Sequence, residues 1–316
     1  MTSPHKVRIG TRGSPLALYQ AAFVARSLET YSDGAIASDL ITYQTKGDQL
    51  TTERLINSGG KGLFTREIDR AVDDGEIDLA VHSLKDVPSE LPDGQSILAC
   101  PKRADARDGL VTVTGARSLA DLPHGATLGT ASLRREAQAL AMRPDLKVVP
   151  FRGNVQTRLK KLEAGEADAT FLAMAGLERL DLAHLAAPIS ITDMLPAASQ
   201  GIIAIVGRRS ALAASLIETL ERLDDDTTHA MATAERAFLR ELDGSCRTAM
   251  AANLSLTDRG WSMRGEVLAP DGQKRWQAEA TALLSASLSD LDALGRMLGK
   301  SIRRQAGGQL PVFEDA

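Results

Sequence analysis

Apolar and polar positions in the first two thirds of the chain alternate between two patterns. Short, mostly apolar runs are typical of buried strands, and they lie at residues 7–11, 40–43, 77–82, 126–130, 147–151 and 167–173. The segments between them carry apolar residues at helical spacing, at residues 16–28, 64–74, 132–143 and 155–164. Pro15 stands where the first helix would begin, and Asn154 where another would have its N-cap. This alternation predicts α/β layers with mainly parallel sheets.

The last third has a different pattern. A helix is expected at residues 229–242, and a long amphipathic helix at about residues 288–304. Between them lie three strand-like runs, separated by Asp-Arg-Gly and Pro-Asp-Gly turns that favour hairpins, at residues 253–257, 261–268 and 274–281. This pattern predicts a separate α+β domain with a small antiparallel sheet, and the acidic stretch at residues 224–226 is expected to be a linker before it.

Composition narrows the class of protein. A chain of 316 residues is longer than one ordinary core, so two or three domains are expected. No apolar run approaches the ~20 residues of a membrane helix, and the N-terminus has no pattern of a signal peptide, so a cytoplasmic protein is expected. A net charge of −4 and only 3% aromatic residues argue against nucleic acid or an anionic membrane as partner.

Cysteine and histidine usage suggests neither disulfides nor a metal. The chain has only two cysteines, Cys100 and Cys246, which argues against a disulfide scaffold and for a reducing compartment. Its five histidines are scattered and show no HxxxH spacing, and there is no CxxC motif, so no metal site is expected. Cys100, between an apolar strand and Pro101, is best explained as a small buried residue.

Basic residues recur just after the predicted strands. They are Arg12, Lys85, Arg134, Arg135 and Arg152, with Arg158 one turn into its helix. Open α/β sheets bind ligands at these strand ends, where helix N-termini also favour anions. For any one residue a solvated surface charge is the better interpretation, but five such residues together favour an anion-rich ligand.

Three further features could carry chemistry. Asp86, beside Lys85, could steer protons or stabilise a developing cation, although a turn or N-cap aspartate is the alternative. The glycine-rich segment at residues 58–64 lacks the Walker A order and is better explained as a mobile flap. Cys246 lies in a tight turn beside Arg247, which would favour the thiolate, but ordinary packing of a small residue is also open. His82 is expected to pack in a strand.

The ordered set of these motifs resembles the porphobilinogen deaminase (hydroxymethylbilane synthase) family over about residues 6–310. The motifs are TRGSPLAL at residues 11–18, GGKGLF at 59–64, VHSLKDVP at 81–88, GTASLRR at 129–135, RGNV at 152–155 and GSC at 244–246. Three departures from the family pattern are Ala131 in place of a Ser or Thr, Ser199 in place of a Gly, and Asp243-Gly-Ser before the cysteine.

The resemblance implies a fold of three domains. Two periplasmic-binding-protein-like (type II) α/β domains would flank a cleft, and a small α+β domain with a three-stranded antiparallel sheet would carry the cysteine. Domain 1 would comprise residues 1–102 and 200–222, domain 2 residues 103–199, and domain 3 residues 223–316. A cytoplasmic monomer is expected, with no nucleic acid or membrane partner.

The resemblance also implies an activity in tetrapyrrole and haem biosynthesis. A dipyrromethane cofactor, bound to Cys246 by a thioether, would prime the condensation of four porphobilinogen molecules with loss of ammonia, and hydrolysis would release hydroxymethylbilane. Each pyrrole carries an acetate and a propionate, so the growing chain is a polyanion. Asp86 would hydrogen-bond pyrrole N–H groups and stabilise the azafulvene cation left when ammonia departs.

The other site residues also follow from the resemblance. Lys85, Ser132, Arg134, Arg135 and Arg158 would bind the cofactor or chain carboxylates. Arg12, Ser14, Arg152, Arg179 and Gln200 would serve the substrate and the elongating chain. Lys61 and Phe64 would belong to the flap.

Two other classes of protein could share some of these features. A non-enzymatic anion-binding module could share the two-domain cleft, but a receptor should have an export signal and a regulator a helix-turn-helix segment. Such a module would need neither Cys246 nor Asp86. A cysteine-nucleophile hydrolase is disfavoured because no histidine partner for the thiol is evident in the motifs.

Overall fold

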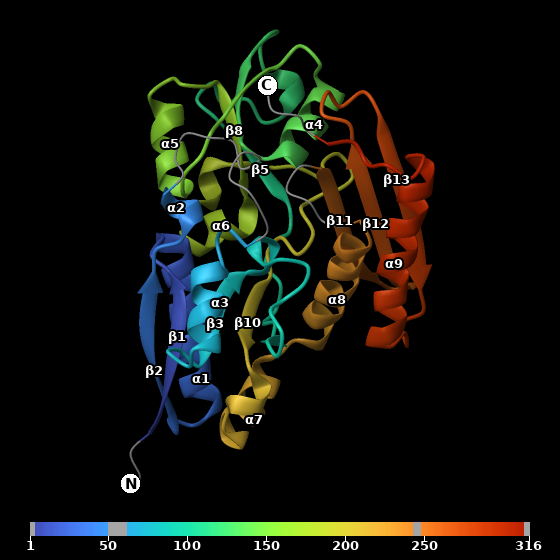
Figure 1. The fold of residues 1–316 in the computed structure, drawn as a ribbon. Coiled ribbons are helices and arrows are strands. Elements are labelled where there is room, and N and C mark those ends of the chain that lie inside the picture. Colours follow the sequence, from blue (N-terminus) through green and yellow to red (C-terminus); the bar gives the residue numbers. More distant parts are fainter. Residues whose placement is uncertain (1–3, 50–61, 243–247, 313–316) are drawn as a thin grey trace. The chain divides into compact units, whose positions relative to one another are not determined.

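The computed structural model describes residues 4–49, 62–242 and 248–312 (Figure 1). The chain divides into two compact units. Unit 1 comprises Met1–Gln49, Gly62–Ala104 and Gly201–Ala232, and unit 2 comprises Leu50–Lys61, Asp105–Gln200 and Thr233–Ala316. No helix in the described ranges is long and apolar enough to cross a membrane.

Unit 1 is built on a five-stranded mixed sheet in the order β2-β1-β3-β10-β4. The strands are β1 (His5–Arg12), β2 (Ile36–Tyr43), β3 (Leu79–Ser83), β4 (Ser96–Ala99) and β10 (Ile203–Gly207). β1 pairs in parallel with β2 and β3, whereas β10 runs antiparallel between β3 and β4. The helices of this unit are α1 (Pro15–Tyr31), α2 (Lys46–Gln49), α3 (Arg66–Asp73) and α7 (Ala214–Leu223), with the start of α8 (Asp226–Glu241).

Both faces of this sheet are covered by apolar packing. On one face Val24 of α1 and Leu220 of α7 pack against alternate residues of the strands, including Ile9 and Ile205. On the other face Ile68 of α3 joins the remaining strand residues. The 3-10 turns η2 (Leu84–Asp86) and η5 (Arg209–Ala211) follow β3 and β10. The sheet is therefore a buried middle layer whose strand ends open to loops.

Unit 2 contains a second five-stranded mixed sheet, in the order β7-β6-β8-β5-β9. The strands are β5 (Asp108–Thr112), β6 (Thr127–Gly129), β7 (Lys147–Val149), β8 (Ala169–Ala173) and β9 (Ala187–Pro188). β6 is parallel to β7 and β8, and β5 is antiparallel to β8 and β9. The sheet's helices are α4 (Leu133–Met142), α5 (Val155–Glu163) and α6 (Met174–Arg179), with the 3-10 turns η3 (Leu119–Asp121) and η4 (Ala183–Leu185).

The rest of unit 2 is a three-stranded antiparallel sheet covered by helices. Its strands follow one another as hairpins: β11 (Ala249–Thr257), β12 (Gly260–Leu268) and β13 (Arg275–Ala282). α9 (Leu288–Gln305), which begins at a capping box formed by Ser287 and Asp290, packs on β12 and β13. Gly295 of α9 comes so close to α8 that an added Cβ would lie 2.1 Å from the Ala234 carbonyl oxygen. Only glycine fits there.

The predicted fold class is confirmed: two α/β sheets and a small antiparallel sheet, with strands and helices close to the predicted ranges. One detail was wrong. The α/β sheets are mixed, because β5 and β10 enter antiparallel to their neighbours. The acidic stretch is a short junction between α7 and α8, in which Asp224 accepts a hydrogen bond from the backbone N–H of Cys100 at 2.6 Å.

Candidate active site

In unit 1 the end of β1 places Arg12 at the start of a helix. The Thr11 hydroxyl donates to the Val81 carbonyl oxygen at 3.3 Å, which ties β1 to β3. Ser14 is the N-cap of α1, and its hydroxyl accepts a hydrogen bond from the Ala17 N–H at 3.3 Å. Hydrogen bonds therefore hold the chain on both sides of Arg12, one to the neighbouring strand β3 and one within the first turn of α1.

The Arg12 side chain lies among an aspartate, an aromatic ring and a second carboxylate. Its Nε donates to both carboxylate oxygens of Asp48, at 3.2 and 3.3 Å, and its Nη2 pairs with Oδ1. The guanidinium carbon lies 4.4 Å from the centroid of the Phe64 ring, a cation–π distance. Arg12 Nη1 is 3.9 Å from Asp86 Oδ2. The structure thus brings three predicted site residues together: Arg12, Phe64 and Asp86.

Asp48 was not identified from the sequence, yet it holds Arg12. Burial alone would raise the pKa of Asp48, but hydrogen bonds from Arg12 and Thr45 outweigh burial and lower the pKa. The Thr45 hydroxyl donates to Asp48 Oδ2 at 2.7 Å. Asp48 is therefore ionised and neutralises Arg12, so the charge available beside Asp86 is smaller than the sequence suggested.

Asp86 and Lys85 lie on η2, directly after β3. The Asp86 side chain is 34% exposed, and Lys85 is exposed, so both can reach a ligand in solution. His82 lies in the preceding strand, β3, and is buried. Among the described residues its Nε2 has no hydrogen-bond partner. Burial, helped by the charge of Arg12, lowers the pKa of His82 to about 4. His82 is neutral at pH 7, which agrees with the packing role expected for it.

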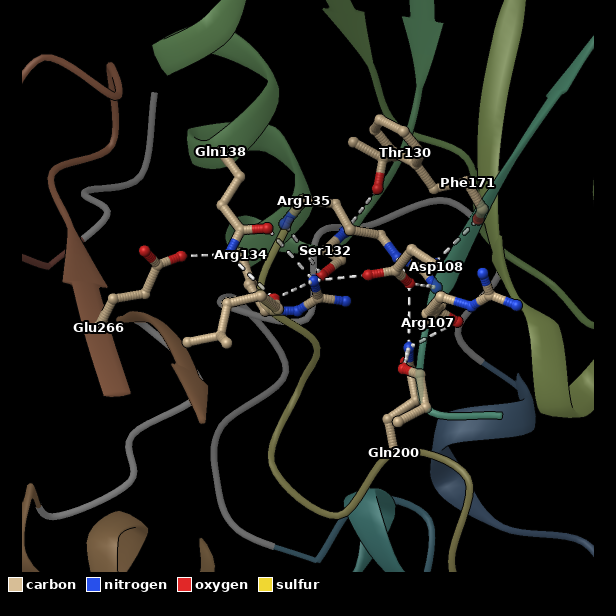
Figure 2. Close-up of polar contacts among 12 residues, drawn as sticks. Arg107, Asp108, Thr130, Ser132, Arg134, Arg135, Gln138, Phe171, Gln200 and Glu266 are labelled. Atoms are coloured by element: carbon tan, nitrogen blue, oxygen red, sulfur yellow. Dashed lines mark hydrogen bonds and ion pairs between the residues drawn. The ribbon is translucent and has the colours of Figure 1, made fainter. Parts of the chain in front are cut away.

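In unit 2 the end of β6 leads into α4 with the same local chemistry. Ser132 is the N-cap of α4; its hydroxyl accepts from the Arg135 N–H at 3.5 Å, and its own N–H donates to the Thr130 hydroxyl at 3.1 Å. Arg134 and Arg135 occupy the first turn of α4, and both are buried. Figure 2 shows both side chains directed toward the start of β5, where Asp108 lies.

Asp108 is the centre of this buried cluster (Figure 2). Arg134 Nη1 donates to its Oδ2 at 2.7 Å, and Arg135 donates to its Oδ1 from Nε at 3.0 Å and from Nη2 at 2.6 Å. Gln200 Nε2 adds a bond to Oδ1 at 3.1 Å. Burial alone would raise the pKa of Asp108, but the charges of the two arginines hold it far below the usual value. Two cations therefore share one carboxylate, which leaves a net charge of about +1.

The two arginines differ in how their donors are used. Arg135 directs all three nitrogens at protein oxygens, because Nη1 also donates to the Phe171 carbonyl oxygen at 2.8 Å. Arg134 Nη1 donates to Asp108 and to the Leu195 carbonyl oxygen, at 2.7 and 2.9 Å, but its Nε is buried with no hydrogen-bond partner in the part of the chain that the structure describes. Arg134 thus retains a donor that an added acceptor could satisfy.

A second buried network connects α4 to the three-stranded sheet. Gln138 Nε2 donates to the Leu195 carbonyl oxygen at 3.0 Å and to Glu266 on β12. Glu266 is 2% exposed and also accepts from Gln277 Nε2 at 2.9 Å. The sequence reasoning missed Asp108, Glu266 and Gln138. For Asp108 the sequence does carry a signal, a charged residue directly before an apolar run.

The other predicted residues occupy several places. Arg152 is buried just after β7, Arg158 in α5 donates from Nε to the Gly153 carbonyl oxygen at 3.0 Å, and Arg179 ends α6 half-buried. Gln200 is fully buried and bonded to Asp108. Lys61 and Cys246 lie outside the described residues.

The comparison with known families decides the assignment. Residues 7–215 match the family model described as "Porphobilinogen deaminase, dipyromethane cofactor binding domain", and residues 229–304 match "Porphobilinogen deaminase, C-terminal domain". The chain belongs to the porphobilinogen deaminase family. A porphobilinogen deaminase of Caulobacter vibrioides is 45% identical over all of both chains, and a chloroplastic porphobilinogen deaminase of rice (Oryza sativa subsp. japonica) is 44% identical over 98% of this chain and 86% of its own.

Membership of the porphobilinogen deaminase family confirms the resemblance and the dipyrromethane cofactor expected from it, and it makes the chain an enzyme; the binding-module alternative is not favoured. Among solved structures, a TRAP periplasmic solute binding protein from Desulfovibrio salexigens is similar over 73% of this chain and 76% of its own, with 13% identity and a TM-score of 0.45.

Proposed function

We propose that this chain condenses four porphobilinogen molecules, head to tail, onto a dipyrromethane bound to Cys246, with loss of ammonia, and then releases hydroxymethylbilane by hydrolysis. The observation that carries the proposal is the match to both porphobilinogen deaminase domains, which together span residues 7–215 and 229–304. Arginines at the strand ends of both units give that match a physical basis, because the substrate and product are polyanions.

The cationic cluster of unit 2 fits a carboxylate-bearing cofactor. Asp108 is a single carboxylate facing two buried guanidiniums, and Arg134 keeps a buried Nε without a partner among the described residues. An acetate or propionate arm would supply both the missing charge and the missing acceptor. Ser132, Arg134, Arg135, Arg158 and Lys85 are the proposed holders. When bound, the cofactor provides the pyrrole carbon to which the first substrate is joined.

Asp86 is the proposed catalytic group. When the aminomethyl group of porphobilinogen loses ammonia, the remaining carbon becomes cationic, and a nearby carboxylate stabilises that charge. Asp86 is exposed enough to meet the substrate, and its 3.9 Å separation from Arg12 Nη1 is longer than a hydrogen bond. Its carboxylate is therefore not fully engaged by that arginine and can turn toward a substrate pyrrole.

Arg12, Ser14, Arg152, Arg179 and Gln200 are the proposed substrate and chain residues. Arg12 is held by Asp48 through Nε and Nη2, so Nη1 is the nitrogen best placed for a substrate carboxylate. Phe64 covers the Arg12 guanidinium and with Lys61 would form the flap over it. The three-domain division, the monomeric state and the cytoplasmic location remain predictions.

Intact-protein mass spectrometry tests the proposal. Purified wild type should carry the mass of two pyrrole units, and Cys246→Ser should carry none and make no product. Cys100→Ser is the matched control and should keep the adduct, because Cys100 is fully buried in unit 1. An unmodified wild type that still forms hydroxymethylbilane would rule the proposal out.

A further inference from the structure

A cluster of three potential metal ligands lies in unit 1 and includes none of the residues proposed for catalysis. It consists of Cys100, Asp224 and His229, each with one ligand atom within 4.8 Å of the others'. Cys100 follows β4, Asp224 caps the C-terminus of α7, and His229 lies in the first turn of α8. The three donors are a thiol, a carboxylate and an imidazole; Asp224 and His229 are 5 residues apart, and Cys100 lies 124 residues before Asp224.

Backbone bonds hold these donors in place before any ion arrives. The Cys100 N–H donates to Asp224 Oδ1 at 2.6 Å, and the Cys100 carbonyl oxygen accepts from the Asp225 N–H at 2.9 Å. Asp224 Oδ2 is hydrogen-bonded to His229 Nδ1 at 2.8 Å. One carboxylate oxygen is therefore anchored to the backbone of Cys100, and the other faces the imidazole, as expected of a preoriented ligand set.

We propose that these three residues bind one zinc ion, or a similar borderline-soft divalent cation. Zinc bonded at about 2.0–2.3 Å to sulfur, nitrogen and oxygen would need donor atoms roughly 3–4 Å apart, which small movements from the present separations provide. Thiolate and imidazole favour zinc over magnesium or calcium, which prefer oxygen ligands. The thiolate and the carboxylate together neutralise the two positive charges of the ion.

The exposure of the cluster suits an ion that enters from solution. Cys100 is fully buried, but the side chains of Asp224 and His229 are 19% and 27% exposed. Three protein ligands leave a fourth position for water on the exposed side. The bound ion would link the end of β4 to the start of α8. Both segments lead out of unit 1 within a few residues, at Ala104 and Ala232, so binding would restrain two chain connections between the units.

Cobalt(II) titration of the chelator-treated holoprotein tests this proposal. Mass spectrometry first confirms that Cys246 carries the cofactor, so that Cys100 is the one cysteine without an adduct. One equivalent of cobalt should produce a near-ultraviolet thiolate-to-cobalt absorption in wild type and none in Cys100→Ala. His229→Gln should bind at least about tenfold more weakly. His184→Gln, at an exposed histidine of η4, is the control and should bind like wild type.

Thermal unfolding gives an independent readout. Excess zinc should raise the melting temperature of wild type and leave that of His229→Gln nearly unchanged, because only the native ligand set binds the ion. His229→Gln replaces a partly exposed residue, so it remains informative if Cys100→Ala does not fold. No thiolate absorption in wild type, or equal absorption in Cys100→Ala, would overturn the metal site. This inference does not depend on the activity, since product formation and the Cys246 adduct are measured in separate experiments. Failure of the metal site would therefore leave the proposed enzyme activity standing.

Discussion

Units 1 and 2 build the same strand-to-helix corner but treat its arginines differently. A Gly-Thr pair stands near the end of each strand, Gly10-Thr11 within β1 and Gly129-Thr130 at the end of β6. Each helix follows an N-cap serine, Ser14 in unit 1 and Ser132 in unit 2. Both glycines are closely packed: a Cβ on Gly10 would lie 2.3 Å from the Ile77 side chain, and one on Gly129 2.5 Å from the Phe151 ring, so either neighbour would have to move. In unit 1 the arginine precedes the serine, whereas in unit 2 two arginines follow it inside the helix.

That one difference changes the environment of the charge. Arg12, before the cap, keeps 22% of its side chain exposed and has its own partner in Asp48. Arg134 and Arg135, in the first turn, are buried around a carboxylate with no exposed surface. Partly exposed ion pairs contribute little to stability, but removal of one member of a buried cluster leaves uncompensated charge. We infer that Arg12, at the unit 1 corner, can exchange its protein partner for a ligand. Arg134 and Arg135, at the unit 2 corner, also stabilise the fold.

Asp108→Ala should have the largest effect. It leaves two buried guanidiniums without a carboxylate, and we expect a loss of about 3–5 kcal/mol of unfolding free energy. Chemical denaturation measures the loss. Asp48→Ala is the matched variant in unit 1 and should cost at most about 1 kcal/mol, because Arg12 can then be solvated. Equal losses in the two variants would show that the corners do not differ as described.

Asp86→Asn should abolish most turnover without disturbing the fold. Loss of one preorganised electrostatic group typically lowers kcat by about 10²–10³. The variant should still carry the two-pyrrole adduct, which mass spectrometry detects, while product formation is followed by absorbance. Asp93→Asn, at an exposed turn of the same unit, should behave like wild type. Near-normal product formation by Asp86→Asn would remove Asp86 from the catalytic role.

Arg134→Leu and Arg135→Leu should separate cofactor binding from stability. Arg135 uses all its nitrogens within the protein, so its loss should cost about 1–3 kcal/mol of stability and impair cofactor assembly as a consequence. Arg134 has a buried Nε that lacks a partner among the described residues. Arg134→Leu should therefore lose cofactor loading and lower the stability less than Arg135→Leu does. Adduct fraction and melting temperature are measured together. If both variants load normally, the carboxylate contacts lie elsewhere.

Local patterns in the sequence were enough to predict most helices and strands. Pro15 and Asn154 mark helix starts that the structure has, and the three C-terminal strands were found from their hairpin turns. The direction of β10 could not be predicted in this way, because a short apolar strand has the same sequence pattern whether it runs parallel or antiparallel to its neighbour.

The partners of the charged residues were not predictable either. Asp108 lies 26 residues before Arg134, and Cys100 lies 124 residues before Asp224, so no spacing rule joins them. Their pairing depends on how β5 and β4 enter their sheets. Basic residues at strand ends could be predicted because the local sequence around each one shows the end of a strand. Whether an arginine is available to bind a ligand depends instead on a carboxylate that is distant in the sequence.

Ser199→Gly should have a small effect and, unlike the preceding variants, should raise the free energy of unfolding. Ser199 has φ 64°, a left-handed conformation that disfavours a side chain, and among the described residues its buried hydroxyl has no partner. Its N–H donates to Glu235 Oε2 at 2.5 Å, which holds this backbone and places Gln200 against Asp108. Glycine should stabilise the protein by about 1 kcal/mol, measured by chemical denaturation. Asp33→Gly, at an exposed turn of unit 1 with φ 53°, should gain less, because aspartate tolerates this conformation and its side chain is already solvated. A loss of stability in Ser199→Gly would mean that the Ser199 side chain, and not only its backbone, supports the buried corner of unit 2.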